Sequence, residues 1–191
     1  MSVRTDKNIL SLAVAGVMAA VICVLGPLSV SVGAIPFSLA TLAMYFSLYV
    51  AGWRLGTLSV LVYVCVGMAG MPVFAGYSGG FAQLLGPTGG YIIGYVPMAL
   101  IAGAAIDHSA RRSVQIAGML AGTAVLYAFG TAWYCVQARV ALPAALAGCV
   151  LPFIPGDLLK MAAAMSFGPV VRGRLVQAGL LKSESSMKKI S

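Results

Sequence analysis

Two opposite charges lie three residues apart in a part of the sequence that is otherwise apolar. Asp157 and Lys160 stand between two uncharged stretches, residues 140–156 and 161–171. The i, i+3 spacing places both side chains on one face of a helix. A buried lysine whose charge is maintained by a neighbouring carboxylate can offer its ammonium group to a carboxylate of a ligand. The pair therefore predicts a binding site for a small acid; an ion pair that only fixes helix packing is the alternative.

The composition places this pair inside a membrane. Of 191 residues, 61% are hydrophobic and only 8% are charged, and the mean hydropathy is +0.99. Soluble domains carry about 25% charged residues, so the sequence predicts a polytopic membrane protein in contact with the lipid bilayer. An ionisable residue within a membrane segment usually faces the interior of the bundle and marks a path for a substrate or an ion.

The uncharged intervals predict an all-α integral membrane fold with six transmembrane helices. We expect these helices within one domain, residues 1–191, at about residues 9–25, 37–53, 55–70, 91–106, 113–138 and 153–171. Ten lysine and arginine residues fall on the side of both termini and only Arg139 on the other, which makes that side cytoplasmic. Residues 176–191 then form a polar cytoplasmic tail. Because the basic residues flank hydrophobic segments, the net charge of +8 indicates topology and no nucleic-acid partner.

A glycine- and proline-rich connection, residues 70–90, lies on the outer side of this topology. Non-helical backbone at membrane depth is tolerated only where it is buried in protein or lines a cavity. Asp157 lies 15 residues from Arg172 at the cytoplasmic boundary, which is about 22 Å along a helix and the outer third of the bilayer. The connection and the charged pair thus predict a pocket near the outer face. A connector without a ligand is the alternative.

The residues expected in this pocket are of three kinds: aromatic walls, directional polar groups, and glycines that let a ligand approach the main chain. Together with Asp157 and Lys160 they are Phe74, Gly76, Tyr77, Gln83, Gly86, Thr88, Gly89, Gly90 and Tyr91.

Two further patterns concern partners and chemistry. Ser11, Ala15 and Ala19 recur every four residues, and such a small face allows close approach of another helix, either from a partner or from the same chain. The chain has one histidine and four acidic residues, without a nucleophile–base pair inside the spans. We therefore expect no catalytic residues, no metal site and no cofactor.

Three segments resemble a known family. Gly86-Pro87-Thr88-Gly89-Gly90-Tyr91, followed by Gly94-Tyr95, is similar to the signature of the BioY family, the S components of energy-coupling-factor (ECF) biotin transporters. Residues 35–39 and 155–160 also resemble segments of that family. The resemblance implies a non-enzymatic membrane subunit that binds biotin with high affinity, with Asp157 and Lys160 near the valerate carboxylate.

The resemblance also implies a lid and partners. The loop between the first two helices would cover an outward-opening pocket, with Ile35, Pro36 and Phe37 as lid residues. Ala15 and Ala19 would form the face that docks onto the transmembrane coupling protein of an ECF module, which works with ABC-type ATPases in a bacterial plasma membrane. The alternative function is a stand-alone secondary transporter for biotin or another small carboxylate, coupled to protons through the charged pair.

Overall fold

The computed structural model describes residues 2–31 and 35–181, and this part of the chain is almost entirely helical. Its elements, in chain order, are α1 (Ser2–Leu25), β1 (Ser29–Ser31), β2 (Pro36–Ser38), α2 (Ala40–Met68), α3 (Ala82–Leu85), α4 (Gly89–His108), α5 (Arg112–Ala138), α6 (Leu142–Cys149) and α7 (Ile154–Gln177). The two strands pair antiparallel, with Ser29 opposite Ser38.

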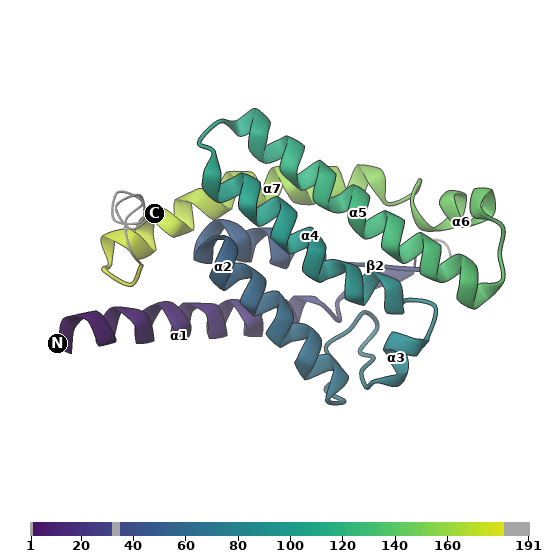
Figure 1. Ribbon diagram of the computed structural model, residues 1–191, viewed down its shortest axis with the longest axis horizontal. Coiled ribbons are helices and arrows are strands. Elements are labelled where there is room, and N and C mark those ends of the chain that lie inside the picture. Colours follow the sequence, from purple (N-terminus) through teal and green to yellow (C-terminus); the bar gives the residue numbers. More distant parts are fainter. Residues whose placement is uncertain (1, 32–34, 182–191) are drawn as a thin grey trace.

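The long helices lie side by side along the long axis of the molecule (Figure 1). Helix α2 is central and packs against α1, α4 and α7, while α4 and α5 form the most extensive helix pair. The start of α1 and the end of α7 lie at one end of the bundle, and α3 and α6 lie at the other (Figure 1). This arrangement leaves the hairpin of β1 and β2 near the end that holds α3 and α6.

Helix α2 is sharply bent at Gly52, which has φ 83° and ψ 172°. Only glycine adopts this backbone conformation readily, and glycine is a common cause of sharp helix kinks. The arm before the kink leads from β2 towards the end where α1 starts, and the arm after it leads away again (Figure 1). The two spans expected at 37–53 and 55–70 correspond to these two arms, with the break at Gly52 rather than beside Arg54.

The apolar character of the long helices confirms a helical membrane protein. In the described part of the chain, α2, α4 and α5 are long and apolar enough to cross a membrane, and α6 with α7 adds a fourth span if this pair, bent by 46°, counts as one. Residues Ile9–Leu25 form a shorter apolar helix. The expected spans at 91–106, 113–138 and 153–171 fall within α4, α5 and α7, apart from the first residue of the last. The expected tail at 176–191 begins as the end of α7, and residues 182–191 lie outside the described part.

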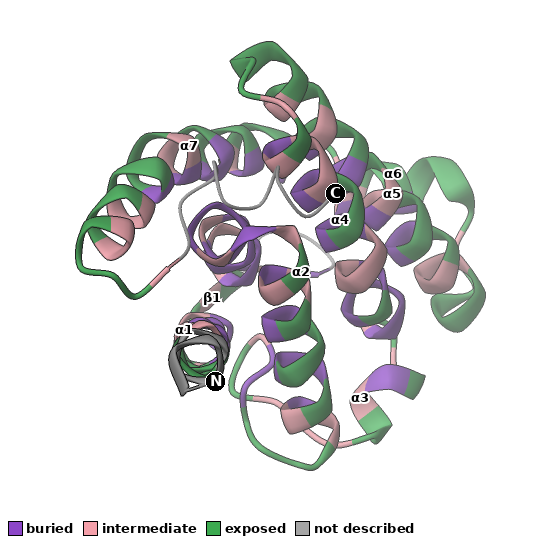
Figure 2. Cartoon of the chain, turned by 60° about the vertical axis from the view of Figure 1, so that its left-hand side comes forward, coloured by how far each residue is buried: buried purple, intermediate pink, exposed green. Residues whose placement is uncertain are grey.

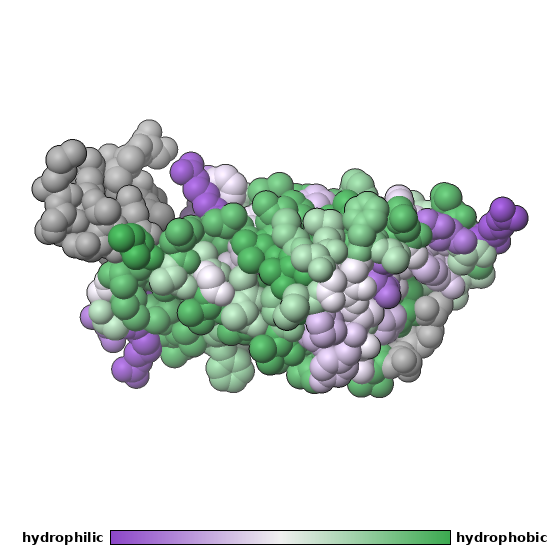
Figure 3. Space-filling view, turned by 90° about the horizontal axis from the view of Figure 1, so that it is seen from below, coloured by the Kyte–Doolittle hydropathy of each residue, from purple (hydrophilic) through white to green (hydrophobic). Residues whose placement is uncertain are grey.

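The outside of the bundle is hydrophobic as well. Buried residues face the middle of the bundle in Figure 2, and the arm of α2 before Gly52 is buried on nearly all sides. On the face shown in Figure 3, hydrophobic residues predominate and strongly hydrophilic ones lie mainly near its ends. Large apolar side chains such as Val136 and Leu159 are more than 70% exposed, at 77% and 73%. A continuous apolar exterior of this kind fits lipid as the surrounding solvent.

Helix α1 uses its small residues differently from the expected docking face. Ala15 and Ala19 are each only 4% exposed, because they face α2. The hydroxyl of Ser59 in α2 donates a hydrogen bond to the backbone carbonyl of Ala15 at 2.8 Å. Of the two interpretations of this small-residue face, these contacts fit packing within the chain, because the small size of the two alanines lets α2 approach. Ala13, Gly16 and Ala20 are small residues on the exposed side of the same helix.

Candidate functional site

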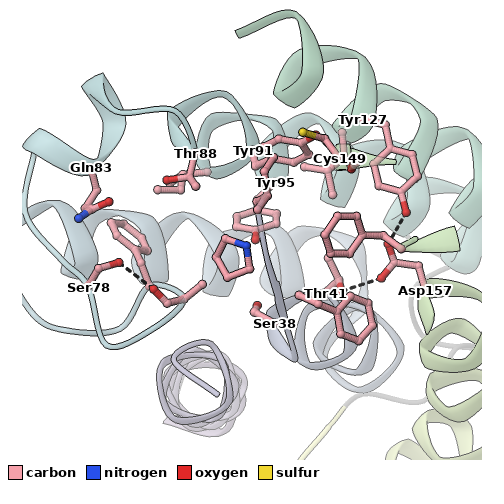
Figure 4. A pocket seen from close by; sticks show the side chains of 18 of the residues that line it. Ser38, Thr41, Ser78, Gln83, Thr88, Tyr91, Tyr95, Tyr127, Cys149 and Asp157 are labelled. Atoms are coloured by element: carbon pink, nitrogen blue, oxygen red, sulfur yellow. Dashed lines mark hydrogen bonds between the residues drawn. The ribbon is translucent and has the colours of Figure 1, made fainter. Parts of the chain in front are cut away.

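A cavity of about 310 Å³ lies at the end of the bundle that holds β2, between α2, α4, α5 and α7. This volume falls in the usual range for small-molecule pockets. Aromatic and aliphatic side chains form most of its wall, with a few polar groups (Figure 4). One ion pair, between Asp157 and Lys160, also lines it. The lining residues are Ile35, Pro36, Phe37, Ser38, Thr41, Tyr63, Phe74, Ala75, Ser78, Gln83, Thr88, Tyr91, Ile92, Tyr95, Leu126, Tyr127, Cys149, Phe153, Asp157 and Lys160.

The ion pair lies in the first two turns of α7. Pro155 is in the first turn, where its missing N–H and fixed φ are suited to starting a helix. Asp157 follows, and a carboxylate near a helix N-terminus interacts favourably with the helix dipole. Asp157 and Lys160 are 7% and 6% exposed, and Nζ of Lys160 lies 2.9 Å from Oδ1 of Asp157. The expected side-by-side placement of the two charges is thus present in the structure.

Lys160 has a full set of hydrogen-bond acceptors. Besides Asp157, its ammonium donates to Oγ1 of Thr41 at 3.0 Å and to the backbone carbonyl of Ser38 at 2.7 Å. An ammonium has three N–H donors, so all three are used. The ring of Phe37 lies over the same nitrogen, with its centroid 3.5 Å away, in a cation–π contact. An anion that binds Lys160 directly must therefore replace one of these acceptors.

Asp157 is held by hydroxyl groups from two other helices. The hydroxyl of Tyr127 in α5 donates to Oδ2, and Oγ1 of Thr41 lies 3.5 Å from Oδ1 (Figure 4). A buried carboxylate is tolerated only when its oxygens are paired with charges or hydrogen-bond donors. The two hydroxyls and Lys160 supply these partners, so the site contains a compensated ion pair that faces a cavity.

The β1–β2 hairpin covers the charged end of the cavity. Ile35, Pro36 and Phe37, the expected lid residues, all line it. The Phe37 ring packs directly on Gly156, where any side chain would overlap the ring, and it stacks on Phe153 with centroids 5.6 Å apart. Because Phe37 also lies over Lys160, the hairpin is attached to the first turn of α7 by packing and by charge. Residues 32–34 of this loop lie outside the described part.

The opposite end of the cavity is polar but uncharged. Ser78, Gln83 and Thr88, from residues 70–90, lie there (Figure 4), and Phe74 and Tyr91 also line the cavity. The Ser78 hydroxyl donates to the carbonyl of Ala75 at 2.9 Å, which holds this loop in a tight turn. Four residues expected from the sequence, Phe74, Gln83, Thr88 and Tyr91, are therefore brought together with the ion pair around one cavity.

The expected glycines of this region do not line the cavity but pack the loop against its neighbours. A side chain at Gly89 would overlap the carbonyl of Leu84, and one at Gly90 would overlap Trp133 of α5. The carbonyl of Gly86 accepts a hydrogen bond from the indole of Trp133 at 2.9 Å. These contacts fix the start of α4 against α5, so the glycine pattern positions Thr88 and Tyr91 rather than offering main chain to a ligand.

Two further expected residues turn away from the cavity. Tyr77 is 66% exposed, and both Tyr77 and Gly76 have positive φ, at 58° and 71°. They form the tip of the turn between Phe74 and Ser78, which are joined as an isolated β-bridge. The turn thus directs its ends, not its tip, towards the cavity.

Eleven lining residues were not expected from the sequence. Tyr95 follows Tyr91 by one helical turn and belongs to the same sequence motif. The sequence could therefore have predicted that Tyr95 lies on the same face of α4 as Tyr91. The other lining residues have no local sequence signal of this kind. The full set is Ser38, Thr41, Tyr63, Ala75, Ser78, Ile92, Tyr95, Leu126, Tyr127, Cys149 and Phe153.

Comparison with known proteins shows the family. The sequence profile of the BioY family matches residues 1–177. The chain belongs to the BioY family. A biotin transporter BioY of Thermotoga maritima is 35% identical over 78% of this chain and 88% of the relative. A probable biotin transporter BioY of Pyrococcus horikoshii is 39% identical over 76% of this chain and 86% of the relative. The resemblance drawn from residues 86–91 is thereby confirmed.

A solved structure is similar over most of the BioY chain. It is the crystal structure of the S component for biotin from an ECF-type ABC transporter, with a TM-score of 0.78 and 26% sequence identity. The match covers 88% of this chain and 93% of that one. The BioY fold therefore extends across α1 to α7, and the cavity described above lies within the matched family domain.

Proposed function

We propose that this BioY protein is the high-affinity biotin-binding membrane subunit, or S component, of an ATP-driven ECF uptake transporter. The observation that carries the proposal is the buried Asp157–Lys160 pair at one end of a covered, largely aromatic cavity in a chain of this family. Biotin is a small molecule with a carboxylate at one end and a polar ureido ring at the other. A cavity with one charged end and one uncharged polar end matches that distribution.

The carboxylate of biotin is directed to Lys160 in this proposal. Because the three N–H groups of Lys160 are already bound, the carboxylate replaces the carbonyl of Ser38, which belongs to the lid. The fused rings then lie between aromatic walls, with the ureido group at the end of Gln83 and Thr88. Asp157 keeps the lysine charged and in place and does not itself bind the acid.

The membrane arrangement follows from the basic residues and the two arms of α2. We infer six spans, formed by α1, the two arms of α2, α4, α5 and α7, with the termini and the kink of α2 on the cytoplasmic side of a bacterial plasma membrane. The ten-to-one distribution of lysine and arginine supports this orientation. The cavity then opens towards the outside, where a scarce vitamin is captured.

The partners are the transmembrane coupling protein and the ABC-type ATPases of an ECF module. Since Ala15 and Ala19 pack internally, a coupling helix that approaches α1 closely meets Gly16 and Ala20 instead; no atom lies within 4 Å of a side chain built at Gly16. Gly16→Leu should reduce uptake in cells without changing biotin binding by the isolated protein. Ala15→Leu is the matched control, which should lower thermal stability. Normal uptake by Gly16→Leu would exclude this face.

Equilibrium titration of the purified protein in detergent tests the function directly. We expect biotin to bind with a Kd near 1 nM, which corresponds to about −12 kcal/mol, and riboflavin and thiamine not to bind. The absence of biotin binding would contradict the proposal. Uptake that continues when cellular ATP is depleted but a proton gradient is maintained would instead support the stand-alone transporter.

A further inference from the structure

A second ion pair stabilises the break in α2 at the end of the bundle opposite the cavity. In a continuous helix the N–H of Trp53 would donate to the carbonyl of Tyr49, four residues earlier. Here the N–H of Trp53 donates to Oδ2 of Asp107 at 2.8 Å, and the carbonyl of Tyr49 accepts from Nη1 of Arg172 at 3.3 Å. Oδ1 of Asp107 lies 3.5 Å from the same Nη1. The ion pair thus takes the place of one hydrogen bond of the helix.

The backbone at this point depends on both side chains. Gly52 supplies the positive φ, and a methyl group built there would lie 2.9 Å from Oδ2 of Asp107. The side chains of Asp107 and Arg172 are each only 14% exposed. Backbone groups buried without a partner are strongly disfavoured, so these two side chains stabilise the kinked form of α2. We call Gly52, Asp107 and Arg172 the kink junction.

The kink junction connects α2, α4 and α7, three of the four helices that line the cavity. Thr41 and Tyr63 lie 11 residues from it on the two arms of α2, Tyr95 lies 12 residues from it on α4, and Lys160 lies 12 residues from it on α7. At the helical rise these separations are roughly 17 Å, so a change of about 10° between the arms displaces the lining side chains by roughly 3 Å. Such a displacement is as large as the hydrogen-bond distances within the site.

We propose that Asp107 and Arg172 are positioning residues for ligand binding. They fix the angle between the arms of α2, and with it the separation of Thr41 and Tyr63 across the cavity. They contact no lining residue themselves and act through the backbone of α2. The proposal deepens the function proposed above and uses biotin as its probe.

The test compares biotin dissociation from purified variants at a temperature well below unfolding. Asp107→Leu and Arg172→Leu each remove a partner of a buried backbone group, and we expect each to raise the dissociation rate of biotin about tenfold. Asp107→Asn keeps an acceptor for the N–H of Trp53, so its effect should stay below about threefold. Arg174→Leu is the matched control, because it removes the same charge from an exposed position one half-turn further along α7.

A purely structural pair would give a different pattern. Asp107→Leu and Arg172→Leu would then lower the unfolding temperature while their dissociation rates matched that of Arg174→Leu, and this result overturns the proposal. If the leucine variants do not fold, the dissociation rate of the Arg172→Lys variant tests the proposal. This variant keeps the charge, but the shorter lysine side chain lacks the guanidinium whose Nη1 reaches both the carbonyl of Tyr49 and Oδ1 of Asp107, so dissociation should still be about threefold faster. Dissociation at the unaltered rate contradicts the proposal.

A distance measurement separates this proposal from the identity of the ligand. Spin labels at Phe46 and Leu61, one on each arm of α2, are introduced after replacement of the four native cysteines. We expect Arg172→Leu to broaden or shift the distance between the labels, and Arg174→Leu to leave it unchanged. If the unaltered protein fails to bind biotin, the proposed function is wrong, yet this distance still tests the junction. Identical distances in all variants overturn it.

Discussion

Helix α7 contributes to two buried ion pairs that have different kinds of partner. Near its start, Asp157 and Lys160 pair within one helix at 2.9 Å, and the other groups that bind them are two hydroxyls and the carbonyl of Ser38 in β2. Near its end, Arg172 pairs with Asp107 of α4 at 3.5 Å, and the other groups that bind them belong to the backbone of α2. Both pairs are largely buried, so burial alone does not distinguish them.

The partners explain what each pair is suited to do. In the proposed function the carbonyl of Ser38 is exchanged for the carboxylate of the ligand, because a charged acceptor can replace a neutral one at the ammonium of Lys160. While α2 is kinked at Gly52, the N–H of Trp53 and the carbonyl of Tyr49 do not bond to each other, so each depends on its side-chain partner. The Asp157–Lys160 pair at the cavity is therefore suited to exchanging one partner for a ligand, whereas the Asp107–Arg172 pair at the kink is suited to keeping its partners.

The largest expected effect is the loss of the cation at the cavity. Lys160→Met leaves Asp157 buried without its counter-charge, and breaking a buried pair costs about 3–5 kcal/mol. We expect the Kd for biotin to rise more than a hundredfold in a titration of the purified variant. Asp157→Asn, which keeps the lysine, should have a smaller effect. Equal binding by Lys160→Met and the unaltered chain would make this pair structural as well.

Replacing both charged residues of each ion pair with neutral residues tests how much each pair contributes to stability. Asp157→Asn with Lys160→Met removes both charges, and such replacements are often close to neutral. Asp107→Leu with Arg172→Leu leaves the N–H of Trp53 and the carbonyl of Tyr49 unpaired, at about 1–3 kcal/mol for each group. Thermal unfolding in detergent should therefore show a clear loss for the second double variant only. Similar unfolding temperatures for both would remove the distinction between the pairs.

The pair at the cavity can also be tested by changing the charge of the ligand instead of the protein. Biotin amide has the shape of biotin without its negative charge, and a hydrogen bond to a charged group contributes about 1.5–3 kcal/mol. We expect the unaltered protein to bind the amide at least tenfold more weakly than biotin. In Lys160→Met this preference should disappear. A preference that survives the substitution would place the carboxylate elsewhere in the cavity.

The sequence predicted the fold and the ion pair at the cavity, but it did not predict the ion pair at the kink. The helical membrane fold followed from composition, and the Asp157–Lys160 pair followed from two charges in an uncharged interval. Asp107 and Arg172 lie at helix ends among other charged residues, so nothing local shows that they meet. Gly52 was close to the expected break at Arg54, but its role depends on partners 55 and 120 residues away. Long-range packing, not local pattern, decides such contacts.

The same reason explains the residues that sequence reasoning placed differently. Gly89 and Gly90 are conspicuous in the chain because they are glycines, and the structure uses them for contact with Leu84 and Trp133. Ala15 and Ala19 are conspicuous as a small-residue face, which α2 covers. A pattern of small residues predicts a close approach but not which segment approaches. Tyr127, in contrast, binds Asp157 from 30 residues away and carries no signal in the sequence.

The smallest expected effect concerns this tyrosine. The hydroxyl of Tyr127 donates to Oδ2 of Asp157, the carboxylate oxygen that does not bind Lys160. In Tyr127→Phe the ring remains in the wall of the cavity, but Asp157 loses a donor and with it part of the restraint that holds Lys160 towards the ligand. A hydrogen bond to a charged group contributes about 1.5–3 kcal/mol, and because Tyr127 acts on the ligand only through Asp157 and Lys160, the Kd for biotin should rise by a part of this, about three- to tenfold.

The matched control for this change is Tyr134→Phe, seven residues further along α5, which removes a hydroxyl from a tyrosine outside the cavity lining. Its Kd should stay at the value of the unaltered protein. The two variants also separate positioning from direct contact, because a hydroxyl that acts only through Asp157 has no further effect once Asp157→Asn has been made. We therefore expect Tyr127→Phe to weaken binding in the unaltered background and to add little in Asp157→Asn. Full additivity of the two changes would show that Tyr127 contacts the ligand itself.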